Sequence, residues 1–79
     1  MGVDAIDMKN GMTTSDMEES NIKRAAIACA DEVFFLADSS KFDTVAPVRF
    51  ASLSDGRILT EKKPPKAYLQ SAKSIEIAQ

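Results

Sequence analysis

The chain lacks histidine and tryptophan and contains a single cysteine, Cys29. Without histidine, one chain cannot build a zinc site from His and Cys ligands. For the same reason, no serine or cysteine can be activated by an imidazole base. A single cysteine also excludes an internal disulfide. Any chemistry must therefore rely on carboxylates, lysines, hydroxyl groups and backbone atoms, and we expect neither a metal nor a cofactor.

The sequence also lacks an excess of positive charge and any long apolar run. Ten basic residues against twelve acidic ones give a formal net charge of −2 at pH 7. This balance, with the basic residues spread along the chain, does not indicate a nucleic-acid surface. We find no signal peptide, so we expect a cytoplasmic protein without membrane contact. A chain of 79 residues has a marginal core, which a partner chain or further segments would stabilise.

The first clear element is a helix expected at about residues 15–30. Ser15 followed by Glu18 is typical of a capping box, in which each side chain satisfies a free backbone amide at the start of the helix. An apolar stripe at helical spacing should pack on a sheet. Its members are Ile22, Ala25, Ala26 and Cys29. We therefore expect Cys29 to be a small core residue.

Several strands are expected around this helix. Residues 33–37 form a continuous apolar run, which is typical of a strand buried on both faces of a parallel sheet. Further strands are expected at residues 48–51, 57–60 and 74–78, with a helix from Pro64 to Ala72 and the end of a strand at residues 2–7. Residues 9–11 and 54–56 have turn composition. Strands that alternate with helices predict an α/β fold with a largely parallel sheet.

Polar residues follow two of the expected strands, where open α/β sheets bind ligands. Asp4 lies in the strand end expected at residues 2–7, and the Asp38–Lys41 segment follows the apolar strand expected at residues 33–37. A lysine beside hydroxyl groups suits a phosphate, and a carboxylate suits sugar hydroxyls. The residues alone favour another interpretation, in which Asp38 caps a turn and Lys41 is a solvated charge. Lys23 is then an ordinary surface charge paired with Glu19.

Two segments closely resemble the C-terminal effector domain of DeoR-type bacterial repressors. They are residues 18–27, with a Glu-x-x-x-Lys-Arg helix, and residues 33–42, with an apolar strand ending in Asp-x-Ser-Lys-Phe. Residues 2–6 and 11–14 also follow the family pattern, while the sequence from Leu53 onward matches more loosely. The resemblance implies that residues 1–79 are the C-terminal part of the effector-binding domain. The winged helix-turn-helix and the first part of the domain would then be absent from this chain, which would not bind operator DNA by itself.

The effector domain of that family is similar to ribose 5-phosphate isomerase type A. This similarity implies a fragment of a Rossmann-like, largely parallel sheet with flanking helices. Asp4 falls on a sugar-contacting carboxylate of the isomerase, and Lys41 falls on its ligand-facing lysine. Lys23 falls where the isomerase has its general-base glutamate, and a lysine cannot act as that carboxylate base. The glycine-rich loop is also absent, because Met12–Ser15 stands in its place.

The resemblance therefore implies a non-enzymatic sensor of a phosphorylated sugar, in a repressor that forms a homo-oligomer. Lys23 and Lys41 would hold the anion and Asp4 the hydroxyl groups, and Asp38 and Ser40 would be further ligand-binding residues in the loop that carries Lys41. The resemblance reverses the preference for a solvated Lys41. The alternative is an isomerase-like enzyme or its remnant, with Glu19 as the base. A third possibility is a role in subunit assembly alone.

Overall fold

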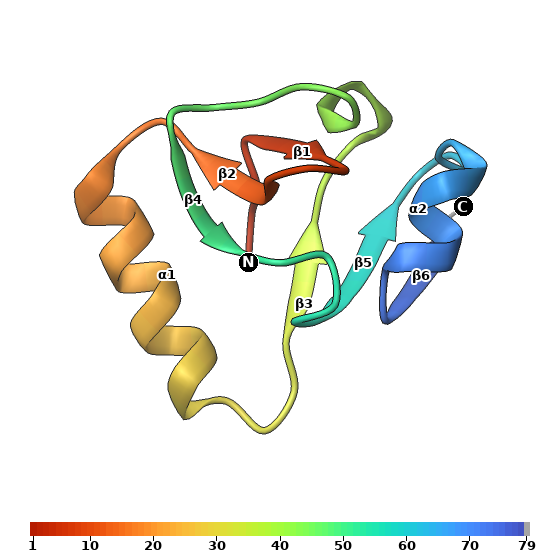
Figure 1. The fold of residues 1–79 in the computed structure, drawn as a ribbon. Coiled ribbons are helices and arrows are strands. Elements are labelled where there is room, and N and C mark those ends of the chain that lie inside the picture. The colour runs from red at the N-terminus through yellow and green to blue at the C-terminus, as the bar shows by residue number, and fades with distance from the viewer. Residues whose placement is uncertain (79) are drawn as a thin grey trace.

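The computed structural model describes residues 1–78, which form two three-stranded sheets and two helices (Figure 1). The antiparallel sheet has the order β1-β2-β4, from β1 (Ala5–Asp7), β2 (Gly11–Thr14) and β4 (Val48–Ala51). The parallel sheet has the order β3-β5-β6, from β3 (Phe34–Leu36), β5 (Arg57–Thr60) and β6 (Ser74–Ile77). The helices are α1 (Met17–Cys29) and α2 (Lys66–Ser71), and Ser39–Lys41 form a 3-10 turn, η1.

The α/β class is confirmed, but a largely parallel sheet is wrong for half of the strands. The Rossmann-like arrangement stays a prediction. The expected strands at residues 48–51 and 57–60 match β4 and β5, and the later helix and strand agree within two residues. Within residues 1–78, neither helix is long and apolar enough to cross a membrane.

The antiparallel sheet begins with a hairpin whose second strand the sequence analysis missed. The predicted turn at residues 9–11 joins β1 to β2. The Asp7 carboxylate closes it by accepting hydrogen bonds from the backbone and side-chain nitrogens of Asn10, at 3.2 and 3.1 Å. Gly11 has a φ of 76°, and a Cβ there would lie 2.6 Å from the carbonyl oxygen of Ala51. Glycine is therefore required both by the turn and by the close approach of β4.

The core lies between the two sheets. Phe35 and Ile58 of the parallel sheet and Ile6 and Met12 of the antiparallel sheet are fully buried. The ring of Phe35 meets the ring of Phe50 edge to face, with centroids 6.2 Å apart. One apolar core therefore stabilises both sheets.

The expectation that residues 33–37 are buried on both faces is wrong. Phe35 is fully buried, but Phe34 and Leu36 are 38% and 50% exposed. Helix α1 packs on β2 and β4, while α2 turns Tyr68 into the core. The apolar face that carries Phe34 and Leu36 is therefore left uncovered. The outer edge of β3 is paired, because its backbone bonds to residues 1–3.

The predicted cap of α1 is displaced by one residue. Asp16 is the N-cap, and its carboxylate accepts a hydrogen bond from the Glu19 amide at 3.1 Å. Ser15 is not the cap, because its amide donates instead to the carboxylate of Asp4 at 3.2 Å. The second member of the expected capping box, Glu18, therefore has no reciprocal partner at Ser15. A carboxylate at the N-cap still stabilises the positive end of the helix.

The predicted packing face of α1 is also wrong. Ile22 is 71% exposed, and Cys29 is exposed and not a core residue. The helix instead buries Ser20 and half-buries Lys23, and the side chains of Ser20, Lys23 and Arg24 donate to backbone carbonyls. Polar side chains can pack in this way because each bond satisfies a donor and an acceptor together.

We expect the uncovered face of the parallel sheet to bind a second copy of the chain, in line with the predicted homo-oligomer. Leu36→Lys should shift the protein toward the monomer with unchanged circular dichroism, because a charge on this face opposes burial of apolar surface. Light scattering at high concentration measures this shift. Ile22→Lys, on the exposed side of α1, is the matched control and should leave the mass unchanged. A parent chain that is a monodisperse monomer and binds no apolar dye would contradict the prediction.

Candidate functional site

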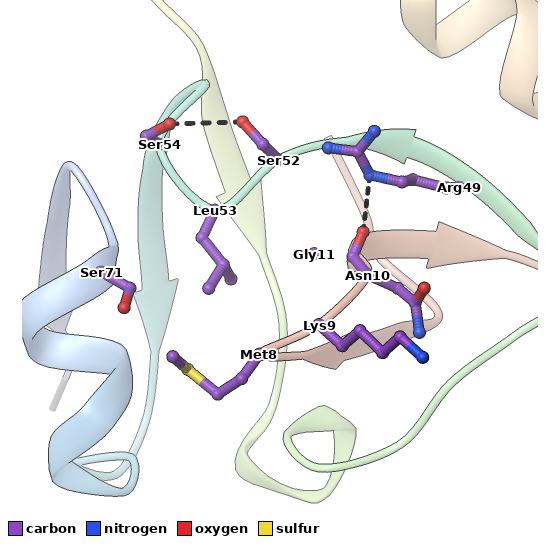
Figure 2. Close-up of a pocket in the computed structure, with 9 residues that line it drawn as sticks. All are labelled: Met8, Lys9, Asn10, Gly11, Arg49, Ser52, Leu53, Ser54 and Ser71. Carbon is purple, nitrogen blue, oxygen red and sulfur yellow. Dashed lines mark hydrogen bonds between the residues drawn. The ribbon is translucent and has the colours of Figure 1, made fainter.

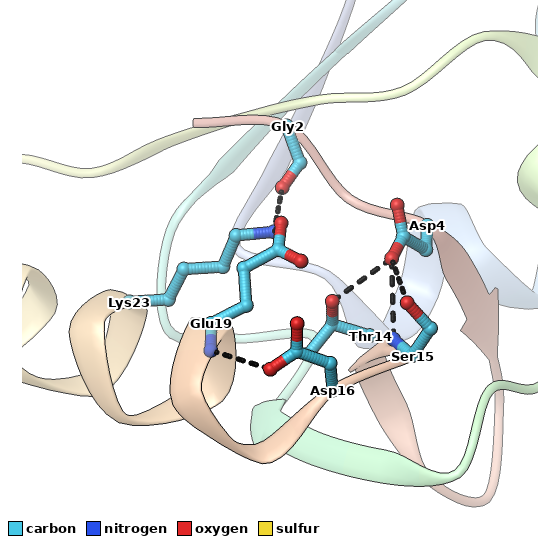
Figure 3. Close-up of polar contacts among 7 residues, drawn as sticks. All are labelled: Gly2, Asp4, Thr14, Ser15, Asp16, Glu19 and Lys23. Carbon is cyan, nitrogen blue, oxygen red and sulfur yellow. Dashed lines mark hydrogen bonds and ion pairs between the residues drawn. The ribbon is translucent and has the colours of Figure 1, made fainter.

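Asp4 is held just before β1 by the segment that leads into α1. Its Oδ2 accepts hydrogen bonds from the Thr14 hydroxyl at 2.8 Å and from the Ser15 amide at 3.2 Å (Figure 3). The hydrogen bond from Thr14 is the main cause that lowers the pKa of Asp4 below its ordinary value. The bond from Ser15 and the positive charges of Lys23 and Lys41 act in the same direction. The site therefore contains an ionised carboxylate in a fixed orientation.

Lys23 extends from α1 toward the strand that carries Asp4. Its ammonium donates to the carbonyl oxygen of Gly2 at 2.8 Å and pairs with Glu19 at 3.3 Å (Figure 3). It also lies 4.9 Å from the centroid of the Phe50 ring, and the side chain is only 13% exposed. An ammonium has three N–H donors. One of them remains after the hydrogen bond to Gly2 and the ion pair with Glu19.

The Asp38–Lys41 segment is a turn stabilised from within and from outside. Asp38 is the N-cap of η1 and accepts hydrogen bonds from the amide and the hydroxyl of Ser40. Ser39 donates its amide and hydroxyl to the two carboxylate oxygens of Glu61, at 2.6 and 2.8 Å. The hydrogen bond from the Ser39 side chain is the main cause that lowers the pKa of Glu61. The sequence analysis missed Glu61, which follows β5.

Lys41 differs from the other polar side chains of this region. Its ammonium has no hydrogen-bond or ion-pair partner in the part of the chain that the structure describes. A backbone bridge between Ile6 and Phe42 sets this loop beside β1. The charge of Lys41 lies close enough to Asp4 to help lower the pKa of that carboxyl group. The ammonium of Lys41 is therefore available to an external anion.

The structure therefore brings together three of the five predicted site residues. Asp4 precedes β1, Lys23 lies in α1 and Lys41 lies in η1, and the charges of both lysines help to lower the pKa of the Asp4 carboxyl group. Asp38 and Ser40 instead form hydrogen bonds with each other. Their part in ligand binding stays a prediction, and the contacts seen here give them a role in shaping the loop.

A separate hollow of about 190 Å³ lies beside the turn that joins β1 to β2 (Figure 2). It is lined by residues 8–11 and 52–54 together with Arg49 and Ser71. Arg49 donates from Nε to the carbonyl oxygen of Asn10 at 2.8 Å. None of the five predicted residues lines this hollow. Across residues 1–78, no group of three or more Cys, Asp or Glu side chains could hold a metal ion.

Comparison with known proteins identifies the family. Residues 1–62 match the family model described as the DeoR C terminal sensor domain. The chain belongs to this family. The matched range contains Asp4, Lys23 and the Asp38–Lys41 loop of this sensor domain, and it ends before α2.

Curated relatives of the sensor domain are named as transcriptional regulators. One is the HTH-type transcriptional regulator FruR of Bacillus subtilis (strain 168), described as uncharacterized, with 35% identity over 60 residues. Another is the HTH-type transcriptional regulator GlpR of Haloferax volcanii, with 34% identity over 55 residues. These matches cover 76% and 70% of this chain but only 24% and 22% of the relatives. The chain thus spans about a quarter of the length of the regulators that it matches.

Proposed function

We propose that this sensor domain binds a phosphorylated sugar. The observation that carries the proposal is the unpartnered ammonium of Lys41 in the same neighbourhood as the ionised carboxylate of Asp4. A cation and an anion without a direct ion pair between them suit a ligand with an acidic end and a hydroxylated end. Phosphate is the group that a free ammonium binds most readily, through charge-assisted hydrogen bonds.

Each residue has a distinct part in the proposal. Lys41 is the main contact to the phosphate, and the remaining donor of Lys23 is the second. Asp4 uses Oδ2 for Thr14 and Ser15, and Oδ1 accepts no hydrogen bond from residues 1–78. That oxygen is available to sugar hydroxyls. Glu19, the carboxylate that an isomerase-like reaction would use, is paired with Lys23 at 3.3 Å, which favours a sensor over an enzyme.

In the intact regulator, we infer that the sugar phosphate controls repression. A ligand shifts a protein between two states only through different affinity for each. The relatives are HTH-type regulators by name, so the states are those with high and low affinity for DNA. We expect the DNA-binding activity to belong to the intact regulator and not to the residues of this chain.

Thermal unfolding with added ligands tests the proposal. We expect ribose 5-phosphate or a related sugar phosphate to raise the melting temperature, because a ligand at 100 times its Kd stabilises the folded state by about 2.7 kcal/mol. Free sugars and inorganic phosphate are the controls and should raise it less, because each lacks one end of the ligand. If no sugar phosphate has an effect, the proposal fails and a role in assembly is favoured. Isomerase turnover abolished by Glu19→Gln would instead establish the enzyme.

A further inference from the structure

Tyr68 lies outside the family match and contacts the two residues that follow the Asp38–Lys41 loop. It lies in α2 and is 1% exposed. Its hydroxyl donates to Oδ1 of Asp43 at 2.7 Å and accepts the Asp43 amide at 3.1 Å. The ring packs edge to face on Phe42, with centroids 4.9 Å apart. Two consecutive residues at the end of the loop are therefore held by one side chain of α2.

The phenol stays neutral at any physiological pH, so its single proton remains available to Asp43 at 2.7 Å, with the Ile6 carbonyl as a second, longer acceptor at 3.4 Å. Burial is the main cause that raises the pKa of Tyr68, to about 12, and the hydrogen bond to Asp43 adds to it. A phenol with a raised pKa contributes stability that is complete below its unfolded pKa of about 10. That contribution is lost as the pH rises from about 10 to 12.

Asp43 requires this support because of its backbone. Its φ is 62°, and no other residue except glycine has a positive φ in the described chain. Aspartate enters this left-handed region more readily than most residues, but the conformation still persists only when neighbours hold it. Tyr68 bonds both the amide and the carboxylate of Asp43. The phenol therefore stabilises the turn that ends the loop.

The turn at Asp43 is coupled directly to Lys41. The next residue, Thr44, donates its hydroxyl to the Lys41 carbonyl at 2.6 Å and its amide to the Ile6 carbonyl at 3.2 Å. The other end of the loop is held by the bonds from Ser39 to Glu61. The loop is thus fixed at both ends, and the fixation at Asp43 comes from beyond residue 62, where the family match ends.

We propose that Tyr68 is a positioning residue that keeps the backbone of Lys41 in place beside β1 by holding Asp43. A helix outside the family-matched region would thereby set the ligand affinity of the sensor domain. This inference rests on the proposed function, because it assigns the ligand to Lys41. It goes further by predicting that affinity depends on a side chain that does not touch the ligand.

Calorimetry with ribose 5-phosphate as the probe tests this inference on the chain itself. Tyr68→Phe removes the hydroxyl and keeps the ring on Phe42, and we expect it to weaken binding about 5- to 10-fold. Asp43→Asn keeps an acceptor and tolerates a positive φ, so it should bind within about 2-fold of the parent. Asp43→Ala loses both properties and should resemble Tyr68→Phe. Parent affinity in folded Tyr68→Phe and Asp43→Ala would overturn the inference, because a merely structural Tyr68 would lower only the melting temperature.

A second measurement keeps the inference testable if the parent chain binds no sugar phosphate. Tyr68 is the only tyrosine and the chain has no tryptophan, so alkaline absorbance titration reports on this phenol alone. Asp43→Ala should move the midpoint from about 12 toward the ordinary value. Amide hydrogen exchange at Lys41 and Thr44 should become faster in Tyr68→Phe than in the parent. Unchanged exchange would overturn the inference, whereas faster exchange without ligand binding would refute only the proposed function.

Discussion

Replacing Lys41 with alanine should weaken binding of the sugar phosphate about 10-fold or more. A charge-assisted bond from lysine to phosphate contributes roughly 1.5–3 kcal/mol, and ~1.4 kcal/mol is a factor of ten in affinity. Lys41→Gln keeps a donor without the charge and should fall between the alanine variant and the parent. Titration of the effector measures the loss. In the intact regulator, operator binding without effector should be unchanged, so the variant should fail to release its genes.

The matched control for this experiment is Lys9→Ala. Lys9 is an exposed lysine on the turn that lines the separate hollow, and it should leave the effector midpoint unchanged. If Lys41→Ala has the midpoint of the parent, the assignment of the Asp38–Lys41 loop to the ligand is wrong. If Lys9→Ala weakens binding instead, the ligand lies in the hollow lined by Arg49.

Phe35→Ala should have the largest effect on stability. Phe35 is fully buried between the two sheets, and removing a buried phenylalanine costs about 3–5 kcal/mol. Small domains have only about 5–15 kcal/mol in total, so this change should remove a large share of the free energy of unfolding. Urea denaturation followed by circular dichroism measures this change in the free energy of unfolding.

Phe34→Ala is the control on the same strand. Phe34 is 38% exposed and contacts Arg57 through its ring at 5.9 Å. Its loss should cost about 1 kcal/mol or less, because a partly exposed cation–π contact is weak. If Phe34→Ala and Phe35→Ala lower the free energy of unfolding equally, the uncovered face is buried in solution, for example in a dimer.

The sequence predicted elements where the local signal is strong. The bounds of β4 and β5 agree with the expectation, because short apolar runs lie on either side of the turn at residues 54–56. It missed β2, although Asn10-Gly11 is a common hairpin signal, because four residues are too few to show alternation. It also chose the wrong face of α1, since periodicity assumes that apolar side chains face inward. In the structure, the side chains of Lys23 and Arg24 instead donate hydrogen bonds to backbone carbonyls.

The residues of the candidate site were also predicted only in part. The residues alone favoured a solvated Lys41, and only the family resemblance selected it together with Asp4. Glu61 and Tyr68 had no local signal, because they lie 22 and 25 residues from their partners Ser39 and Asp43. Such contacts depend on how distant segments meet, which neither composition nor spacing encodes.

The strand order has a consequence for how the chain acquires its shape. The strands of the two sheets alternate along the sequence, since β3 lies between β2 and β4 and β4 lies between β3 and β5. Only the β1–β2 hairpin pairs consecutive strands through a short turn, because β5 and β6 are joined through α2 and the other paired strands are separated by a further strand, so each of those pairings must first close a longer loop. During synthesis, the antiparallel sheet must wait for β4, and the parallel sheet must wait for β6. The loop that carries Lys41 therefore leaves the ribosome before α2 and stays without its Tyr68 support until α2 has emerged and docked.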